Sequence, residues 1–185
     1  MGKLIIGLSD QVGSPKVSGA PLSGWLGDIE AGAMKAGHEV ARVTGTAGAC
    51  RNYARQTARE HSGPVLYVVP ACGRDPGVSF SHRSKAGRKA AEALAGALGI
   101  PANLVEPLGV LVDDWRAVDG LGPSPENLAA VLLAPFNYEV LSQDDNPGAQ
   151  EADIGASILA VVLAELGPVK KPKKKKPAKK EAGDG

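Results

Sequence analysis

The residues best suited to covalent chemistry are a cysteine, a histidine and two aspartates, each following a segment expected to be a strand. Cys72 comes soon after the apolar run 65–69, and His82 and Asp113 follow two further runs. Ligands of parallel sheets bind where the strands end. A Cys72 thiolate could therefore act as a nucleophile, with His82 as its base and Asp113 or Asp114 orienting the histidine. In the alternative interpretation, Cys72 is a small apolar residue in a turn.

A second set of residues could bind a small ligand without reacting with it. Asp114 adjoins Trp115 in a long polar stretch, and Gln11 lies in the loop after the first apolar run. An aromatic ring beside polar groups suits a sugar or a peptide, so these residues are candidates for a ligand cleft. A solvated loop with one anchored aromatic side chain explains the same residues equally well.

The sequence predicts neither a metal site nor a cofactor. His38, His61 and His82 are expected at a strand start, a helix end and a turn, which is not the spacing of zinc ligands. The glycines of residues 7–19 form neither a dinucleotide-binding motif nor a phosphate-binding loop. No bound cofactor is therefore expected.

Residues 168–185 are rich in lysine and proline and are expected to be an extended tail. Of the 21 basic residues 8 lie here, with only 2 of the 20 acidic ones, so the tail carries +6 and the remainder −5. The lysines could bind the phosphates of nucleic acid or another polyanion without sequence preference; a solubilising tail is the alternative. These lysines are Lys170, Lys171, Lys173, Lys174, Lys175, Lys176, Lys179 and Lys180.

Composition narrows the class of protein. Two cysteines, Cys50 and Cys72, are too few for a disulfide framework, and no apolar run is long enough to span a membrane. No signal peptide is recognised, so we expect reduced thiols and a cytoplasmic location without membrane attachment. The sequence leaves open whether the protein forms an oligomer, and whether its source is a cell or a virus.

The elements that would position these side chains alternate between strands and helices. Apolar runs predict strands at residues 3–8, 38–43, 65–69, 78–81, 108–112 and 129–133. Helical spacing predicts helices from 23 to the stop at Gly37, over 49–61, from a cap at Ser84 to 98, and from Asn146 onward. This order predicts an α/β fold, with a mostly parallel sheet covered by helices on both faces, as a single domain over residues 1–167.

The helix over residues 49–61 has a predicted inner face. Cys50, Tyr53 and Thr57 share one side of the helix, whereas Arg51 and Arg55 fall on the others. We therefore expect the tyrosine inside and the arginines in solvent.

Four short segments give the sequence a resemblance to the zinc-dependent N-acetylmuramoyl-L-alanine amidases, which cleave peptidoglycan between glycan and stem peptide. KLIIGLSD with Ser18-Gly19-Ala20 resembles the opening strand and glycine loop of that family, and KAGHEV its first helix end and second strand. LYVVPACG followed by GVSF resembles its central strand and the hairpin after it, and AVLLAPFN its last strand. The resemblance implies an amidase-like fold over most of the chain.

The resemblance also shows where this sequence departs from the family. The family binds zinc with two histidines and a glutamate, and uses a further glutamate as catalytic base. Here the first histidine's neighbourhood contains Asp10 and Gln11, the second histidine falls on Ala71 or Pro70, and the catalytic glutamate falls on Ala134. Alanine offers no donor atom to zinc. The departures favour a non-catalytic binding or assembly protein, whose partner is a cell-wall fragment or another protein, over an active amidase or a Cys72-dependent hydrolase.

Overall fold

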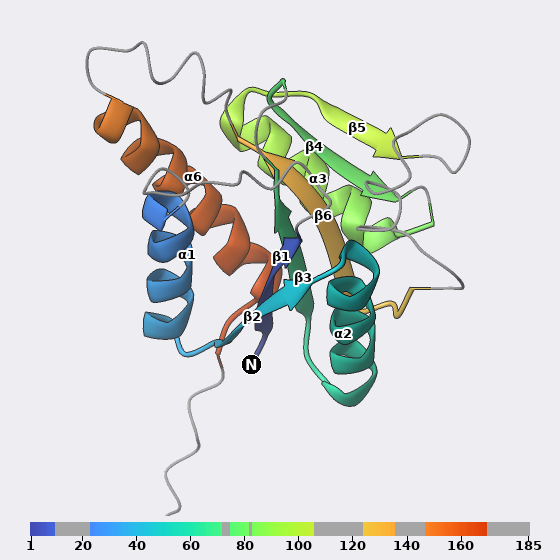
Figure 1. Cartoon of the computed structure of the whole chain (residues 1–185). Coiled ribbons are helices and arrows are strands. Elements are labelled where there is room, and N and C mark those ends of the chain that lie inside the picture. Colours follow the sequence, from blue (N-terminus) through green and yellow to red (C-terminus); the bar gives the residue numbers. More distant parts are fainter. Residues whose placement is uncertain (10–22, 72–74, 82, 106–123, 136–146, 170–185) are drawn as a thin grey trace, which may run out of the picture.

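The computed structural model describes residues 1–9, 23–71, 75–81, 83–105, 124–135 and 147–169 (Figure 1). Six strands in these ranges form one sheet in the order β2-β1-β3-β6-β4-β5. Their bounds are β1 Lys3–Ser9, β2 Glu39–Gly45, β3 Val65–Pro70, β4 Gly77–Ser81, β5 Ala102–Val105 and β6 Leu128–Ala134.

The sheet is mostly parallel, as predicted. β2, β1, β3 and β6 run in one direction, whereas β4 is antiparallel to β6 and β5 follows the direction of β4. The edge at which the four parallel strands begin is called the amino edge below, and the edge at which they end is the carboxyl edge. The polypeptide therefore leaves β3 at the carboxyl edge and leaves β4 at the amino edge.

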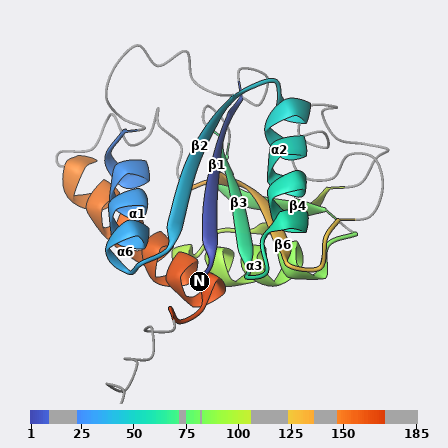
Figure 2. The same cartoon turned by 90° about the horizontal axis from the view of Figure 1, so that it is seen from below.

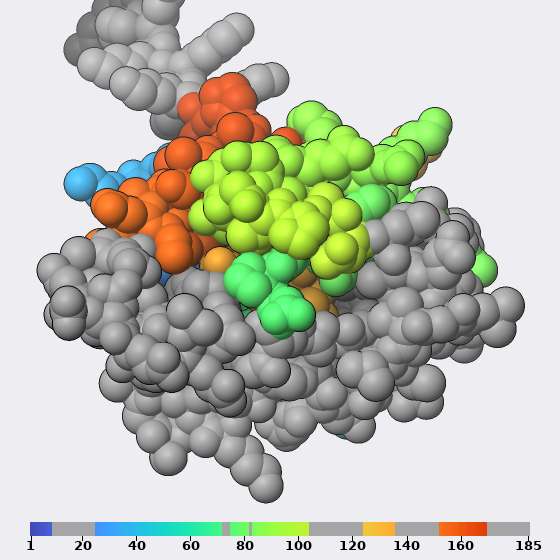
Figure 3. Space-filling model, turned by 90° about the horizontal axis from the view of Figure 1, so that it is seen from above, coloured from blue at the N-terminus to red at the C-terminus, as the bar shows by residue number. Residues whose placement is uncertain are grey.

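Helices cover both faces of the sheet, which confirms the predicted α/β domain (Figure 2). One face carries α1 (Ser23–Lys35), α3 (Lys85–Leu98) and α6 (Pro147–Leu166), and the other carries α2 (Ala47–Glu60). α3 and α6 pack side by side, and an ion pair of 3.0 Å joins Lys89 to Glu165 across them (Figure 3). Within the described residues, no helix is both long and apolar enough to cross a membrane.

Alternating strand residues supply the two halves of the core. Leu66 and Val68 of β3 face α1, α3 and α6, whereas Tyr67 and Val69 face α2. Every residue of β3 and β6 is buried, which accounts for their unbroken apolar sequences.

The predicted helix ends are confirmed where they are described. The Ser84 hydroxyl accepts a hydrogen bond of 2.9 Å from the amide of Gly87 and so caps α3. Gly99 ends the helix with a left-handed φ of 67°, a conformation that glycine adopts without strain. Asn127 fixes the end of α2 from outside, because its side-chain amide lies 2.9 Å from three carbonyl oxygens, those of Ala58, His61 and Gly63.

Two expectations about the strands differ from the structure. The expected hairpin of β3 with the strand after it is wrong, because β6 is inserted between β3 and β4. The strand predicted at residues 108–112 lies outside the described residues, and β5 was not predicted. β5 is an edge strand of four residues whose described side chains are exposed, so it lacks the apolar run that marks a buried strand.

Candidate functional site

Small apolar side chains lie at the ends of the two neighbouring strands β3 and β6. Ala71 follows β3 and is fully buried, and its amide donates a hydrogen bond of 2.8 Å to the carbonyl of Leu133 in β6. Ala134 ends β6, is 1% exposed, and pairs with Gly77 of β4. These two alanines lie on neighbouring strands at the carboxyl edge. The described ends of β3 and β6 therefore carry methyl groups where a parallel sheet commonly places reactive side chains.

Beneath α2, next to this edge, a small polar cluster is enclosed in the core. The ring of Tyr67 crosses over β1 at Gly7, where a Cβ atom would lie 2.5 Å from the tyrosine oxygen, so only glycine fits. The buried Cys50 thiol lies 3.5 Å from the carbonyl oxygen of Val43. Burial raises the pKa of Tyr67 far above its ordinary value of 10.0, the neighbouring Cys50 raises it further, and the charge of Arg51 opposes both. Tyr67 is therefore neutral at physiological pH and does not serve as a base.

Cys50 and Thr57 of α2 are buried as predicted, but three residues of the helix differ from the prediction. Arg51 and Arg55 are each only 7% exposed, whereas Tyr53 is 42% exposed. The arginine stems are apolar enough to pack against the core, and Arg51 keeps its charged end bonded, donating to the Asn52 side chain at 3.2 Å. Tyr53 instead lies at the rim of a surface pocket.

Two of the three histidines are at the amino edge, each bonded to one side of the same peptide group. Nδ1 of His38 accepts a hydrogen bond of 3.2 Å from the amide of Gly2, and Nε2 of His61 donates to the carbonyl of Met1 at 3.0 Å. His82 lies outside the described residues. In the described part of the chain, no group of three or more His, Cys, Asp or Glu side chains could hold a metal ion.

Most of the predicted site residues lie outside the described ranges. These are Gln11, Cys72, His82, Asp113, Asp114, Trp115 and the eight lysines from 170 to 180. The catalytic Cys72–His82 pair and the ligand cleft therefore stay predictions. In the sequence, Cys72 follows β3 and His82 follows β4. These two strands end at opposite edges of the sheet, since Ala71 follows β3 at the carboxyl edge and Ser81 ends β4 at the amino edge.

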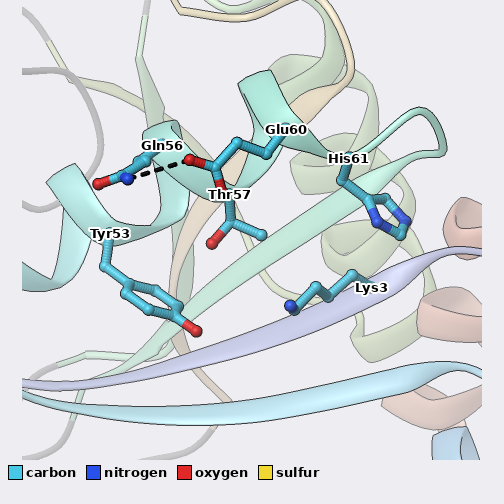
Figure 4. A pocket seen from close by; sticks show the side chains of 6 residues that line it. All are labelled: Lys3, Tyr53, Gln56, Thr57, Glu60 and His61. Carbon is cyan, nitrogen blue, oxygen red and sulfur yellow. Dashed lines mark hydrogen bonds between the residues drawn. The ribbon is translucent and has the colours of Figure 1, made fainter.

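A polar pocket at the amino edge was not predicted. It has a volume of about 350 Å³ and lies between α2 and the beginning of β1 (Figure 4). One signal in the sequence could have indicated this pocket, because four of its lining residues recur at helical spacing on one side of α2. Its lining residues are Lys3, Tyr53, Gln56, Thr57, Glu60 and His61.

Comparison with known proteins gives a likeness of fold. The structure is similar to the catalytic domain of CD27L, an endolysin targeting Clostridia difficile, with a TM-score of 0.52 and 16% sequence identity. The match covers 86% of this chain and 97% of that domain. The N-acetylmuramoyl-L-alanine amidase AmiC2 of Nostoc punctiforme also matches, with a TM-score of 0.44, 12% identity, and coverage of 86% and 96%.

At these identities the likeness concerns the arrangement of strands and helices, and function has to be argued from the site. No protein-family model and no curated protein sequence matches the chain.

Proposed function

We propose that this protein is a non-catalytic domain with an amidase-like fold, which acts as a binding or assembly module. The observation that carries the proposal is the pair Ala71 and Ala134 at the carboxyl ends of β3 and β6. The sequence resemblance aligns Ala71 or its neighbour Pro70 with a zinc-binding histidine, and Ala134 with the catalytic glutamate of the amidases. The fold shared with the CD27L catalytic domain supports the comparison with cell-wall enzymes.

The described residues do not fit a catalytic zinc ion. Such an ion needs three protein ligands with nitrogen, sulfur or carboxylate donors, and an open position for water. Both alanines are buried and offer only methyl groups, while His38 and His61 are committed to the Met1–Gly2 peptide at the other edge. The described residues at this edge of the sheet therefore support no hydrolytic step.

The eight tail lysines supply the attachment in this proposal. They follow Val169, which lies next to Gly37 at the amino edge: a Cβ atom at Gly37 would be 3.5 Å from a methyl of Val169. The lysines therefore start from the edge of the sheet opposite the ends of β3 and β6, so attachment through them does not involve those ends.

Metal analysis combined with a lysis assay tests the non-catalytic role. The purified full chain is assayed for zinc per polypeptide and for clearing of a peptidoglycan suspension, with the CD27L catalytic domain as the positive control. We expect substoichiometric zinc and no clearing. Stoichiometric zinc, together with clearing that a chelator abolishes, would overturn the proposal in favour of an active amidase.

Two further variants separate the remaining alternatives. Cys72→Ser leaves every measured activity unchanged if the protein is not a cysteine hydrolase, and loss of a hydrolytic activity in this variant would establish that alternative. Deletion of residues 170–185 should abolish retention on immobilised DNA, and retention by the full chain should fall steeply with salt. Salt-insensitive retention, or retention that survives the deletion, would remove the tail from the proposal.

A further inference from the structure

The pocket between α2 and β1 is a candidate binding site for a small polar ligand. Its volume of about 350 Å³ falls within the range of ligand pockets and accommodates an amino acid. It lies at the amino edge of the sheet, away from the ends of β3 and β6. An inference about it therefore does not depend on the function proposed above.

Three hydrogen-bond donors face the same space in this pocket. Figure 4 shows the Thr57 hydroxyl above the gap between the Tyr53 hydroxyl and Nζ of Lys3. Two of these groups belong to α2, and the third comes from the first residue of β1. Donors that converge from two elements of structure match the oxygens of one small acidic group.

Thr57 gives the most direct indication of a ligand. The residue is only 9% exposed, and within the described part of the chain its hydroxyl makes no hydrogen bond. A threonine in a helix can bond its hydroxyl to the preceding turn, yet here the hydroxyl faces the pocket. The hydroxyl is not among the buried polar atoms that lack a partner, so it is accessible from the pocket and can bond a ligand oxygen there.

The charges around the pocket favour a ligand that carries a single negative charge together with a positively charged group of its own. The side chain of Lys3 is 20% exposed, and its Nζ already forms an ion pair with Glu39, at 3.3 Å from the carboxylate oxygen. On the other side, the carboxylate of Glu60 is held by the amide of Gln56 at 3.0 Å. A dianion such as phosphate would meet one partly neutralised cation and two carboxylates. A carboxylate beside an ammonium group would be matched at both ends.

We propose that this pocket binds a small zwitterion of the amino-acid class. Lys3, Tyr53 and Thr57 bind its carboxylate, and Glu60 binds its ammonium group. His61 closes the side of the pocket, with its ring held in place by the hydrogen bond from Nε2 to Met1.

A titration followed by amide chemical shifts tests this site on the full, isotope-labelled chain. The probes are L-alanine, propionate, which lacks the ammonium group, and inorganic phosphate. We expect alanine to produce saturable shifts at the amides of residues 53–61, with weaker binding of propionate and phosphate. Equal binding of alanine and propionate, tighter binding of phosphate, or no saturable shift at these amides overturns the proposal.

Matched substitutions show whether the binding belongs to the pocket. Thr57→Val keeps the shape of the side chain and should weaken alanine binding at least about tenfold, the cost of one hydrogen bond to a charged group. Thr44→Val makes the same change at an exposed position of β2 and should leave binding unaltered. Glu60→Gln should remove the preference for alanine over propionate. Equal alanine affinity in the two valine variants would place the ligand elsewhere, provided both give the dispersed spectrum of the folded protein.

Discussion

Replacing Tyr67 with phenylalanine is expected to make this protein more stable. The Tyr67 side chain is fully buried between β1 and α2, and its hydroxyl has no hydrogen-bond partner in the described structure. In the unfolded chain the same hydroxyl is bonded to water. An unsatisfied buried polar group costs about 1–3 kcal/mol, and the void left by one oxygen offsets part of that gain. We therefore expect Tyr67→Phe to raise the free energy of unfolding by about 1 kcal/mol near neutral pH.

The stabilisation should grow in alkaline solution, because the pKa of Tyr67 is higher in the folded protein than its ordinary value of 10.0. The unfolded chain loses this proton as the pH rises past that value, while the folded protein keeps it. The wild type consequently loses stability above the unfolded pKa, by about 1.4 kcal/mol at a pH one unit higher. Phenylalanine cannot ionise, so the difference between variant and wild type should rise to about 2.4 kcal/mol at about pH 11.

Urea unfolding of both proteins at the two pH values measures these differences directly. Other titrating groups are common to the two chains and cancel in the comparison. Tyr53→Phe is the matched control, since this tyrosine is 42% exposed and should change the free energy by less than about 0.5 kcal/mol. Clear destabilisation by Tyr67→Phe, or a difference that does not change with pH, would refute the reasoning.

Two further substitutions test the packing that holds α2 on the sheet. Asn127→Ala should lower the free energy of unfolding by about 2–3 kcal/mol, because three carbonyl groups around the end of α2 lose a shared donor; urea unfolding measures it, and a loss under 1 kcal/mol would contradict the assigned bonds. Gly7→Ala should cost about 1–3 kcal/mol, because the added methyl overlaps the Tyr67 ring, and a melting temperature equal to that of the wild type would show that the ring moves freely.

The buried strands and the helix caps could be predicted because each depends on local sequence. β3 and β6 are continuous apolar runs, and Ser84 and Gly99 mark the ends of α3 by side-chain chemistry and backbone freedom that act within one turn. The place of β4 beside β6 could not be predicted in this way. It depends on which strand fills the position next to β3, and that choice is made by packing between segments far apart in the chain.

The surfaces around α2 show a different limit of sequence reasoning. A periodic pattern places Tyr53 with the apolar residues and the arginines with the polar ones, yet Arg51 and Arg55 are buried and the tyrosine is not. Long arginine stems can be covered while their charged ends stay bonded, so periodicity alone assigns them to the wrong side. The pocket was missed because Lys3 reaches it from β1, and only the pairing of β1 with β3 brings the lysine beneath the helix.

The first strand and the last helix meet at one place, since a Cβ atom at Gly2 would lie 2.6 Å from the carbonyl oxygen of Leu166. The first and last described residues of the polypeptide therefore lie near one another at the amino edge of the sheet. A segment joined to either of these described ends would accordingly start from the side of the domain opposite the ends of β3 and β6.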